Sequence, residues 1–172
     1  MTLKTILAAL IALPTLAAPA VAGGTFDLTS PENAAVCAAR VNDRMTAGDI
    51  DGAMAMGCYA EGAVLRMFVP GNDQPIMTSE SAPDVYAFIQ ATFENFGYVA
   101  TQHLVGSIYV DGDVVHSGVH ATHIKADGTL EIGNADYVDT VAEVDGAFQI
   151  VSRDIHVVNF STVEASPVLR GQ

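Results

Sequence analysis

Apolar and polar residues repeat with two different periods along the chain, a helical period before residue 97 and a strand-like period after it. Ser30-Pro31-Glu32 forms a helix start, because Ser caps free N–H groups, Pro suits the first turn and Glu faces the positive end of the helix dipole. This helix is expected to reach about Thr46, and a short second helix is expected over 50–56. A third helix over 81–96 carries apolar residues at the spacing of one buried face.

Four long runs rich in Val, Ile, Tyr and Thr follow, separated by tight polar turns typical of β-hairpins. They predict strands over 99–110, 114–124, 130–144 and 147–158, after a shorter strand over 64–69. Helices first and an antiparallel meander afterwards predict an α+β fold rather than a parallel α/β sheet. We expect a cone-shaped, strongly curved sheet, mixed or antiparallel, with three helices on its concave face and a ligand-sized pocket between them.

The alternation within two of these strands predicts which side chains face the pocket, since residues two apart share a face of a strand. The more apolar set contains His123 on one strand and Tyr137 and Asp139 on the next, and it is assigned inward. His116 and His120 are then expected outside. A single bulge would exchange the two faces.

The first 22 residues have the pattern of a secretory signal peptide. Lys4 gives a positive start, the apolar run over 6–13 is too short to span a bilayer, and Ala20-Val21-Ala22 has the small-x-small pattern that signal peptidase recognises. We expect cleavage after Ala22 and a periplasmic or secreted protein with no remaining membrane segment. An uncleaved anchor is the weaker alternative, because polar residues follow the short apolar run at once.

About 150 residues remain after cleavage, which suits one domain. They divide into a flexible lead-in over 23–30, a domain over 31–160 and a tail over 161–172. The whole chain has 7 basic and 20 acidic residues, a balance that argues against nucleic acid as a partner. The expected partner is a small apolar or neutral organic ligand. The sequence has no Cys/His spacing typical of a metal site, and neither a metal nor a cofactor is expected.

Cys37 and Cys58 are the two cysteines, and they lie on two consecutive predicted helices. A disulfide is geometrically possible and would persist in an oxidising compartment. The alternative is two small buried apolar side chains, which free cysteines often are. The pattern slightly favours the bridge.

Several motifs resemble the SnoaL-like branch of the nuclear transport factor 2-like fold. Asp43-x5-Asp49 lies on the first helix, and Thr-Gln-His-Leu-Val-Gly over 101–106 opens a long strand and is similar to scytalone dehydratase. The end of the domain also resembles that branch, through Tyr137-x-Asp139, Val144-Asp145-Gly146, Phe148 and Arg153. The resemblance covers 31–158 and is more specific for fold than for activity, because this fold hosts many functions.

The resemblance implies a catalytic pair. In dehydratase and dehydrochlorinase members, an Asp of the first helix orients a strand His that removes a proton from the substrate, and the matching residues here are Asp43 and His103. The chemistry agrees, because an imidazole titrates near neutral pH and a carboxylate at one ring nitrogen fixes its tautomer. The alternatives are a solvated Asp43 paired with Arg40 or Arg44, and a His103 that is merely a hydrogen-bonded core residue.

Three further residues are candidates for substrate binding. His123 would be a second acid or a ligand contact, with a surface histidine as the alternative. Tyr137 would donate to a ligand oxygen, or else only pack its ring in the core. Arg153 is expected to pair with Asp139 on the neighbouring strand, and contact with an anionic substrate is the alternative.

The sequence departs from the dehydratase pattern in two places. Ala38 and Ala39 stand in the first helix where related enzymes often have an aromatic hydroxyl, and the strand over 65–68 lacks a tyrosine. No carboxylate lies near Met67 or Phe68, which argues against the steroid isomerase branch. The expected activity is therefore that of a cofactor-free lyase, dehydratase-like, or an isomerase. The rivals are a ligand-binding domain without catalysis and a homodimer formed through the outer sheet face.

Overall fold

The computed structural model describes residues 26–163, so the expected signal peptide lies outside the described residues. This part of the chain forms three helices and six strands, and none of the helices is long and apolar enough to cross a membrane. In chain order the elements are α1 (Pro31–Thr46), α2 (Ile50–Ala55), β1 (Tyr59–Phe68), β2 (Met77–Ser79), α3 (Ala82–Phe96), β3 (Tyr98–Asp111), β4 (Val114–Lys125), β5 (Leu130–Val144) and β6 (Ala147–Val163).

The long helices start where the sequence signals predict. The Ser30 hydroxyl accepts a hydrogen bond from the Asn33 N–H (3.3 Å) at the start of α1. Ser81 accepts from the Asp84 N–H at the start of α3 in the same way, at 3.3 Å. Gly97 ends α3 with φ 68°, a left-handed conformation that glycine adopts without steric cost.

The six strands form one mixed sheet in the order β2-β1-β6-β5-β4-β3. β1 and β6 run parallel, and the other neighbouring pairs are antiparallel. The sequence pattern does not reveal the short strand β2, and it predicts β1 from 64 although the strand starts at Tyr59. β6 continues to Val163, so residues 161–163 belong to the sheet rather than to a tail.

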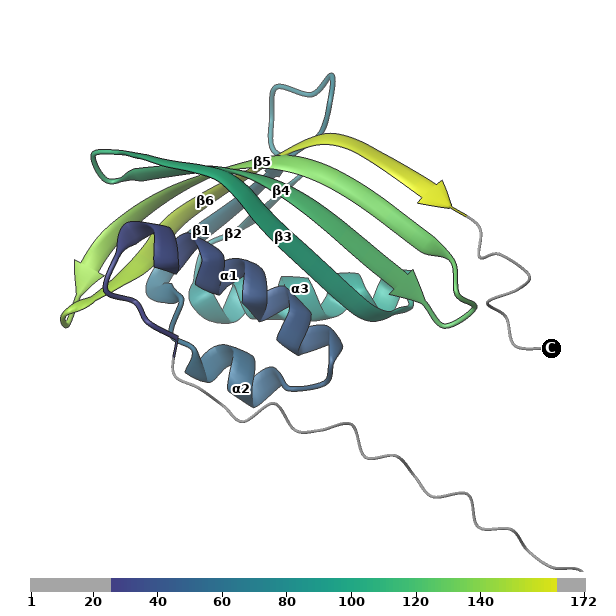
Figure 1. Cartoon of the computed structure of the whole chain (residues 1–172), viewed down its shortest axis with the longest axis horizontal. Helices are drawn as coiled ribbons and strands as arrows, with labels where there is room; N and C mark the ends of the chain where they lie inside the picture. Colours follow the sequence, from purple (N-terminus) through teal and green to yellow (C-terminus); the bar gives the residue numbers. More distant parts are fainter. Residues whose placement is uncertain (1–25, 164–172) are drawn as a thin grey trace, which may run out of the picture.

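The sheet bends over α1 and α3, which lie on its concave side, while α2 packs against α1 (Figure 1). β6 carries one residue more than β5 at Val151 and again at Val158. Each such bulge bends a strand and increases its twist. The pairing of β4 with β5 is continuous, so the predicted faces of these two strands are confirmed: Ser117, Tyr137 and Asp139 are buried, and His120 is exposed.

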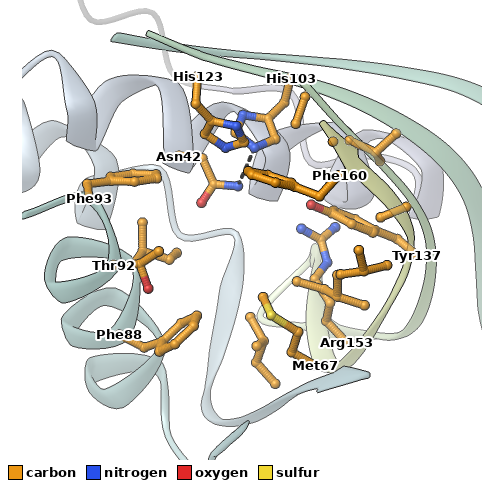
Figure 2. A pocket seen from close by; sticks show the side chains of 18 of the residues that line it. Asn42, Met67, Phe88, Thr92, Phe93, His103, His123, Tyr137, Arg153 and Phe160 are labelled. Atoms are coloured by element: carbon orange, nitrogen blue, oxygen red, sulfur yellow. Dashed lines mark hydrogen bonds between the residues drawn. The ribbon is translucent and has the colours of Figure 1, made fainter. Parts of the chain in front are cut away.

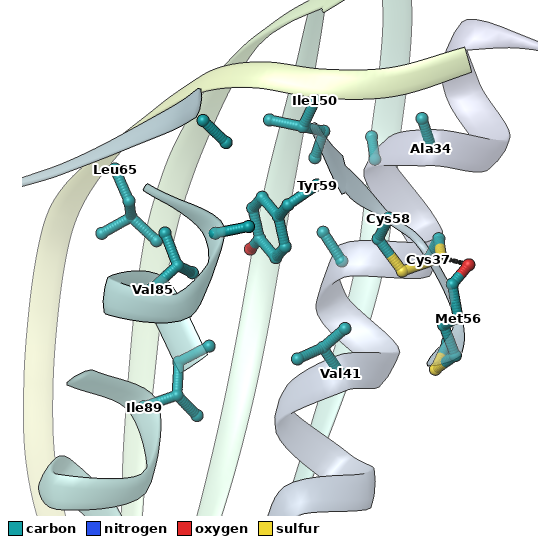
Figure 3. Close-up of a cluster of buried hydrophobic side chains, with 14 of the residues drawn as sticks. Ala34, Cys37, Val41, Met56, Cys58, Tyr59, Leu65, Val85, Ile89 and Ile150 are labelled. Carbon is teal, nitrogen blue, oxygen red and sulfur yellow. Dashed lines mark hydrogen bonds between the residues drawn. A yellow bond between two sulfur atoms is a disulfide. The ribbon is translucent and has the colours of Figure 1, made fainter. Parts of the chain in front are cut away.

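The apolar core fills the space between α1, α3 and the sheet (Figure 3). Val41 of α1, Val85 of α3 and Leu65 of β1 are almost completely buried there. Cys37 and Cys58 form the disulfide, with their Cα atoms 5.6 Å apart. Cys58 stands directly before β1 and not on α2, so the expected placement on a second helix is wrong. The bridge closes a sequence separation of 21 residues, which stabilises the fold by about 3 kcal/mol through the unfolded chain.

Candidate active site

A cavity of about 390 Å³ lies between the sheet and the helices α1 and α3. Its wall is mostly apolar, and a small number of polar side chains point into it (Figure 2). The polar side chains relevant to chemistry are Asn42, His103, His123, Tyr137 and Arg153. An apolar cavity of this size with a few convergent polar groups is the usual form of a small-molecule site.

Asp43 and His103 meet at the α1 side of this cavity. His103 Nδ1 lies 2.8 Å from Asp43 Oδ1, and the His103 side chain is only 5% exposed. The helix supplies the carboxylate and β3 supplies the imidazole, two elements that pack directly on each other. The predicted pairing is therefore present. Arg40 also binds Asp43, as the alternative proposed, but through the other carboxylate oxygen.

The Asp43 carboxylate is held by several donors besides the imidazole. Its Oδ1 also accepts the backbone N–H of His103 (3.1 Å) and the Thr101 hydroxyl (3.3 Å). Its Oδ2 accepts from Arg40 Nη1 at 3.2 Å. Thr101 is itself 2.9 Å from the Thr46 hydroxyl of α1. A carboxylate fixed on both oxygens orients the imidazole that it binds.

Because Asp43 occupies Nδ1 of His103, the other ring nitrogen, Nε2, is the one that can contact a ligand in the cavity. A carboxylate at Nδ1 favours the tautomer with its proton on Nδ1, so Nε2 carries the free lone pair. The amide nitrogen of Asn42 lies 3.5 Å from Nε2, at the outer limit of a hydrogen bond. A ligand C–H or O–H can replace so weak a contact. The pair thus has the arrangement of a general base oriented by a carboxylate.

His123 lines the same cavity, as its predicted inward face requires. Its ring makes an edge contact with His103, with ring centroids 5.5 Å apart. Burial and the neighbouring His103 lower the pKa of His123 to about 4, although Glu131 acts in the opposite direction. His123 is therefore uncharged near neutral pH and can exchange hydrogen bonds with a ligand.

Arg153 pairs with Asp139 as expected, through two hydrogen bonds of 2.6 and 2.7 Å between side chains that are 1% and 0% exposed. Its remaining contacts are the Ala35 carbonyl (3.1 Å) and the Tyr59 hydroxyl (3.4 Å). The guanidinium also lies 4.6 Å from the ring centroid of Tyr137. These contacts leave one N–H of Nη1 without a partner among residues 26–163.

The Tyr137 hydroxyl points toward the guanidinium side of the cavity (Figure 2) and has no hydrogen-bond partner in the described chain. Burial raises the pKa of Tyr137 to about 12, despite the opposing effect of Arg153. The hydroxyl therefore keeps its proton at neutral pH and is available as a donor. Tyr137 and Arg153 together offer two donors to a ligand oxygen on the side of the cavity opposite α3.

Phe160 reaches the cavity because of the bulge at Val158. Without the extra residue, strand alternation would turn Phe160 outward. With it, Phe160 lies opposite Gly133, and Asn159 Oδ1 accepts a hydrogen bond from Asn134 Nδ2 at 2.8 Å. A Cβ at Gly133 would lie 3.2 Å from Phe160 Cδ2, so glycine provides the room that the ring needs.

The structure adds site residues that the sequence argument does not single out. Asn42 precedes Asp43 on α1 and faces the same cavity, which the helical period could have indicated. Tyr98 stacks on His123 from the first position of β3 (4.6 Å between centroids), and Glu131 pairs with His123 across β4 and β5. No short sequence motif marks these contacts, because they join different strands. Among residues 26–163, no cluster of His, Cys, Asp or Glu could hold a metal ion.

No protein-family model matches the chain, and no curated protein matches its sequence. Solved structures do match it in fold. A protein from Novosphingobium aromaticivorans, provisionally assigned as a scytalone dehydratase, is 18% identical with a TM-score of 0.58 over 82% of this chain and 92% of that chain. A second protein from that organism, provisionally assigned as an aromatic ring hydroxylase, is 16% identical with a TM-score of 0.62 over 80% and 93%. The beta subunit of benzoate 1,2-dioxygenase from Burkholderia mallei is 17% identical, with a TM-score of 0.53 over 78% and 92%.

Identities this low establish the fold and leave the activity open. The α+β chain, with three helices and a six-stranded mixed sheet, has the nuclear transport factor 2-like fold that the sequence motifs predict. Within that fold, the cavity holds a buried Asp43–His103 pair.

Proposed function

We propose that this protein is an exported, cofactor-free lyase or isomerase of the SnoaL-like type, which removes a proton from carbon with His103. The observation that carries the proposal is the buried pair, in which Asp43 holds Nδ1 of His103 at 2.8 Å while the other ring nitrogen faces an apolar cavity. Proton transfer by a positioned base contributes about 10²–10⁴-fold to a rate.

The proposed reaction of the lyase form is loss of water from a neutral organic compound with a carbonyl group. Nε2 of His103 takes a proton from the carbon next to the carbonyl, and the C–H electron pair moves toward the carbonyl oxygen. The electron pair then returns to form a C=C bond as a hydroxyl group leaves from the neighbouring carbon. The leaving hydroxyl takes the proton from the imidazolium, which releases water and restores His103. In the isomerase form, the proton returns to a different carbon.

The other polar side chains have proposed roles in holding the substrate. Tyr137 and Arg153 each offer a donor without a partner in the described chain, and both face one region of the cavity (Figure 2). Donors aimed at an oxygen that gains charge stabilise the transition state. His123, uncharged near neutral pH, would bind the leaving group or a second oxygen. The apolar remainder of the wall suits a neutral, mostly apolar substrate.

The test follows proton removal directly, since that step is common to lyase and isomerase. Ketones and β-hydroxyketones with aryl or alkyl bodies are incubated in D₂O with the protein, and deuterium uptake at carbon and loss of water are followed by NMR. We expect His103→Gln to lower the rate by about 10²–10⁴-fold. His120→Gln is the matched control, because His120 is on the exposed face of β4, and it should keep the full rate. A folded His103→Gln protein with an undiminished rate would remove the histidine from the mechanism.

A ligand-binding domain without catalysis is the second candidate, favoured by the mostly apolar wall of the cavity. Mass spectrometry of small molecules extracted from the purified protein separates the two. A compound that is recovered unchanged, retained equally by wild type and His103→Gln, and never deuterated would support binding alone.

Export is supported by the leader-like first 22 residues and by the Cys37–Cys58 disulfide, because disulfides persist mainly in oxidising compartments. N-terminal sequencing of the protein from an expressing bacterium tests this. A mature chain that begins at Gly23 in the periplasmic or secreted fraction is expected, and an intact chain in the cytoplasm would contradict it.

A further inference from the structure

Tyr98 lines the cavity beside His123. Its ring is stacked on that of His123, with centroids 4.6 Å apart and planes at 28°. The Tyr98 ring also stacks with Phe96 (5.6 Å between centroids, 12° between planes). It makes an edge contact with Phe93 (6.1 Å between centroids). The second histidine of the site is thus covered by a continuous group of aromatic rings from α3 and β3.

The Tyr98 ring is fixed from its far end. Its hydroxyl donates a short hydrogen bond to Glu131 Oε2, and Glu131 Oε1 accepts from Lys125 Nζ at 2.6 Å. Glu131 is only 6% exposed, and Lys125 Nζ also lies 5.8 Å from the centroid of the Tyr98 ring. Burial alone would raise the pKa of Glu131, but the hydrogen bonds from Lys125 and Tyr98 hold it below its ordinary value. Glu131 therefore stays charged and both of its oxygens are occupied.

We propose that Tyr98, anchored by Glu131 and Lys125, is a positioning residue that holds the His123 ring over the cavity as an uncharged ligand-binding group. This inference rests on the proposed function and deepens it. It divides the work between the two histidines, with His103 moving the proton and His123 contributing a fixed, neutral hydrogen-bonding group.

The surroundings of His123 explain why the ring stays neutral. Its Nδ1 is buried without a hydrogen bond of normal geometry in the described chain, so a proton added there would lose its contact with water. The ionisable groups near it are His103 of β3, Asp43 of α1, Glu131 of β5 and Lys125 of β4. A positive charge on His103 during turnover disfavours a second one on His123.

The carboxylates of Glu131 and Asp43 act in the opposite direction, and they raise the pKa of His123 less than burial lowers it. Both carboxylates already have cationic or imidazole partners, which weakens their pull on His123. Burial is then the largest influence on the pKa of His123. The Tyr98 ring is one of the groups that bury His123, because it stacks on the imidazole at 4.6 Å.

NMR of the ligand-free, full-length protein tests the proposal without any substrate. In the wild type, the His123 ring protons should be shifted upfield by the Tyr98 ring, and the pKa of His123 should be about 4, well below the ~6.5 of a free histidine. Tyr98→Ala should abolish the upfield shift and raise the measured pKa of His123 by at least about one unit. Tyr98→Phe keeps the ring but removes its hydrogen bond to Glu131, so the upfield shift should be smaller than in the wild type and larger than in Tyr98→Ala.

Tyr109→Ala is the matched control, because Tyr109 stacks on His116 (4.5 Å, 6°) and neither residue lines the cavity. It should leave the His123 signals unchanged. A wild-type His123 that titrates near 6.5, or a folded Tyr98→Ala protein with unchanged His123 signals, would overturn the proposal. The ring-current shift of His123 in the wild type tests the stack with Tyr98 even where Tyr98→Ala does not fold. Failure here leaves the deuterium-exchange test of His103 untouched, so the two ideas can fail separately.

Discussion

The two faces of the sheet carry the same two kinds of side-chain pair in different surroundings. On the inner face, Arg153 binds Asp139 through two hydrogen bonds, and Tyr98 stacks on His123. On the outer face, Arg66 binds Asp154 through two hydrogen bonds (2.6 and 2.9 Å), and Tyr109 stacks on His116.

Burial is what separates the two ion pairs, since their hydrogen-bond distances are nearly equal. The inner ion pair is 1% and 0% exposed, whereas the outer one is 41% and 23% exposed. Water screens the outer charges and can replace either partner, but it cannot reach the inner ones. The same two residue types therefore form a solvent-screened ion pair on the outer face and a water-excluded one beside the cavity on the inner face.

The largest loss of stability is expected when the inner ion pair is broken. Asp139→Asn keeps the shape of the side chain but leaves the Arg153 charge buried and unbalanced, so we expect the free energy of unfolding to fall by about 3–5 kcal/mol. The matched change Asp154→Asn on the outer face should cost about 1 kcal/mol or less. Urea unfolding of both variants measures the difference. Equal losses would show that burial does not distinguish the two pairs.

A smaller loss of stability is expected on acidification, through the inner His123. The unfolded chain binds a proton at His123 below about pH 6.5, whereas the native pKa of His123 is about 4, so the free energy of unfolding falls as the pH falls between these values. Between pH 7 and pH 4.5, the wild type should lose about 1–2 kcal/mol more than His123→Gln, after allowance for partial solvent screening. His120→Gln should follow the wild type. If His123→Gln has the same pH dependence as the wild type, the lowered pKa of His123 is contradicted.

The smallest effect concerns two serine hydroxyls. Ser117 Oγ is buried on the inner face without a hydrogen-bond partner in the described chain, so Ser117→Ala should raise the free energy of unfolding by about 1 kcal/mol. Ser152 Oγ donates to Thr140 Oγ1 (3.2 Å) on the outer side, and Ser152→Ala should lower it by about 0.5–1 kcal/mol. Thermal or urea unfolding of both variants shows whether the free energy of unfolding rises or falls in each. A destabilised Ser117→Ala protein would mean that the hydroxyl is satisfied.

Much of this inner–outer division could be predicted from the sequence. Strand alternation on β4 and β5 placed His123 and Tyr137 inward and His120 outward, because no bulge interrupts the pairing of those two strands. The pairing of Asp43 with His103 followed from a resemblance in short motifs, and the structure places the two groups in hydrogen-bonding distance. Local signals sufficed wherever the backbone stayed regular.

The remainder depends on irregular or long-range features. The bulge at Val158 turns Phe160 inward, and no local sequence pattern predicts this bulge. The three-residue strand β2 is too short for a period to be recognised. The contact of Tyr98 with Glu131 joins residues 33 positions apart, which only the sheet register brings together. Such contacts are set by tertiary packing and not by propensity.

The direct test of the central claim is the tautomer of His103, measured from its ¹⁵N ring shifts at neutral pH in the ligand-free protein. We predict a proton on Nδ1, facing Asp43, and an unprotonated Nε2 facing the cavity. Asp43→Asn should disturb this state, because the amide can present a donor to Nδ1. A wild-type His103 that carries its proton on Nε2 instead would contradict its role as the base.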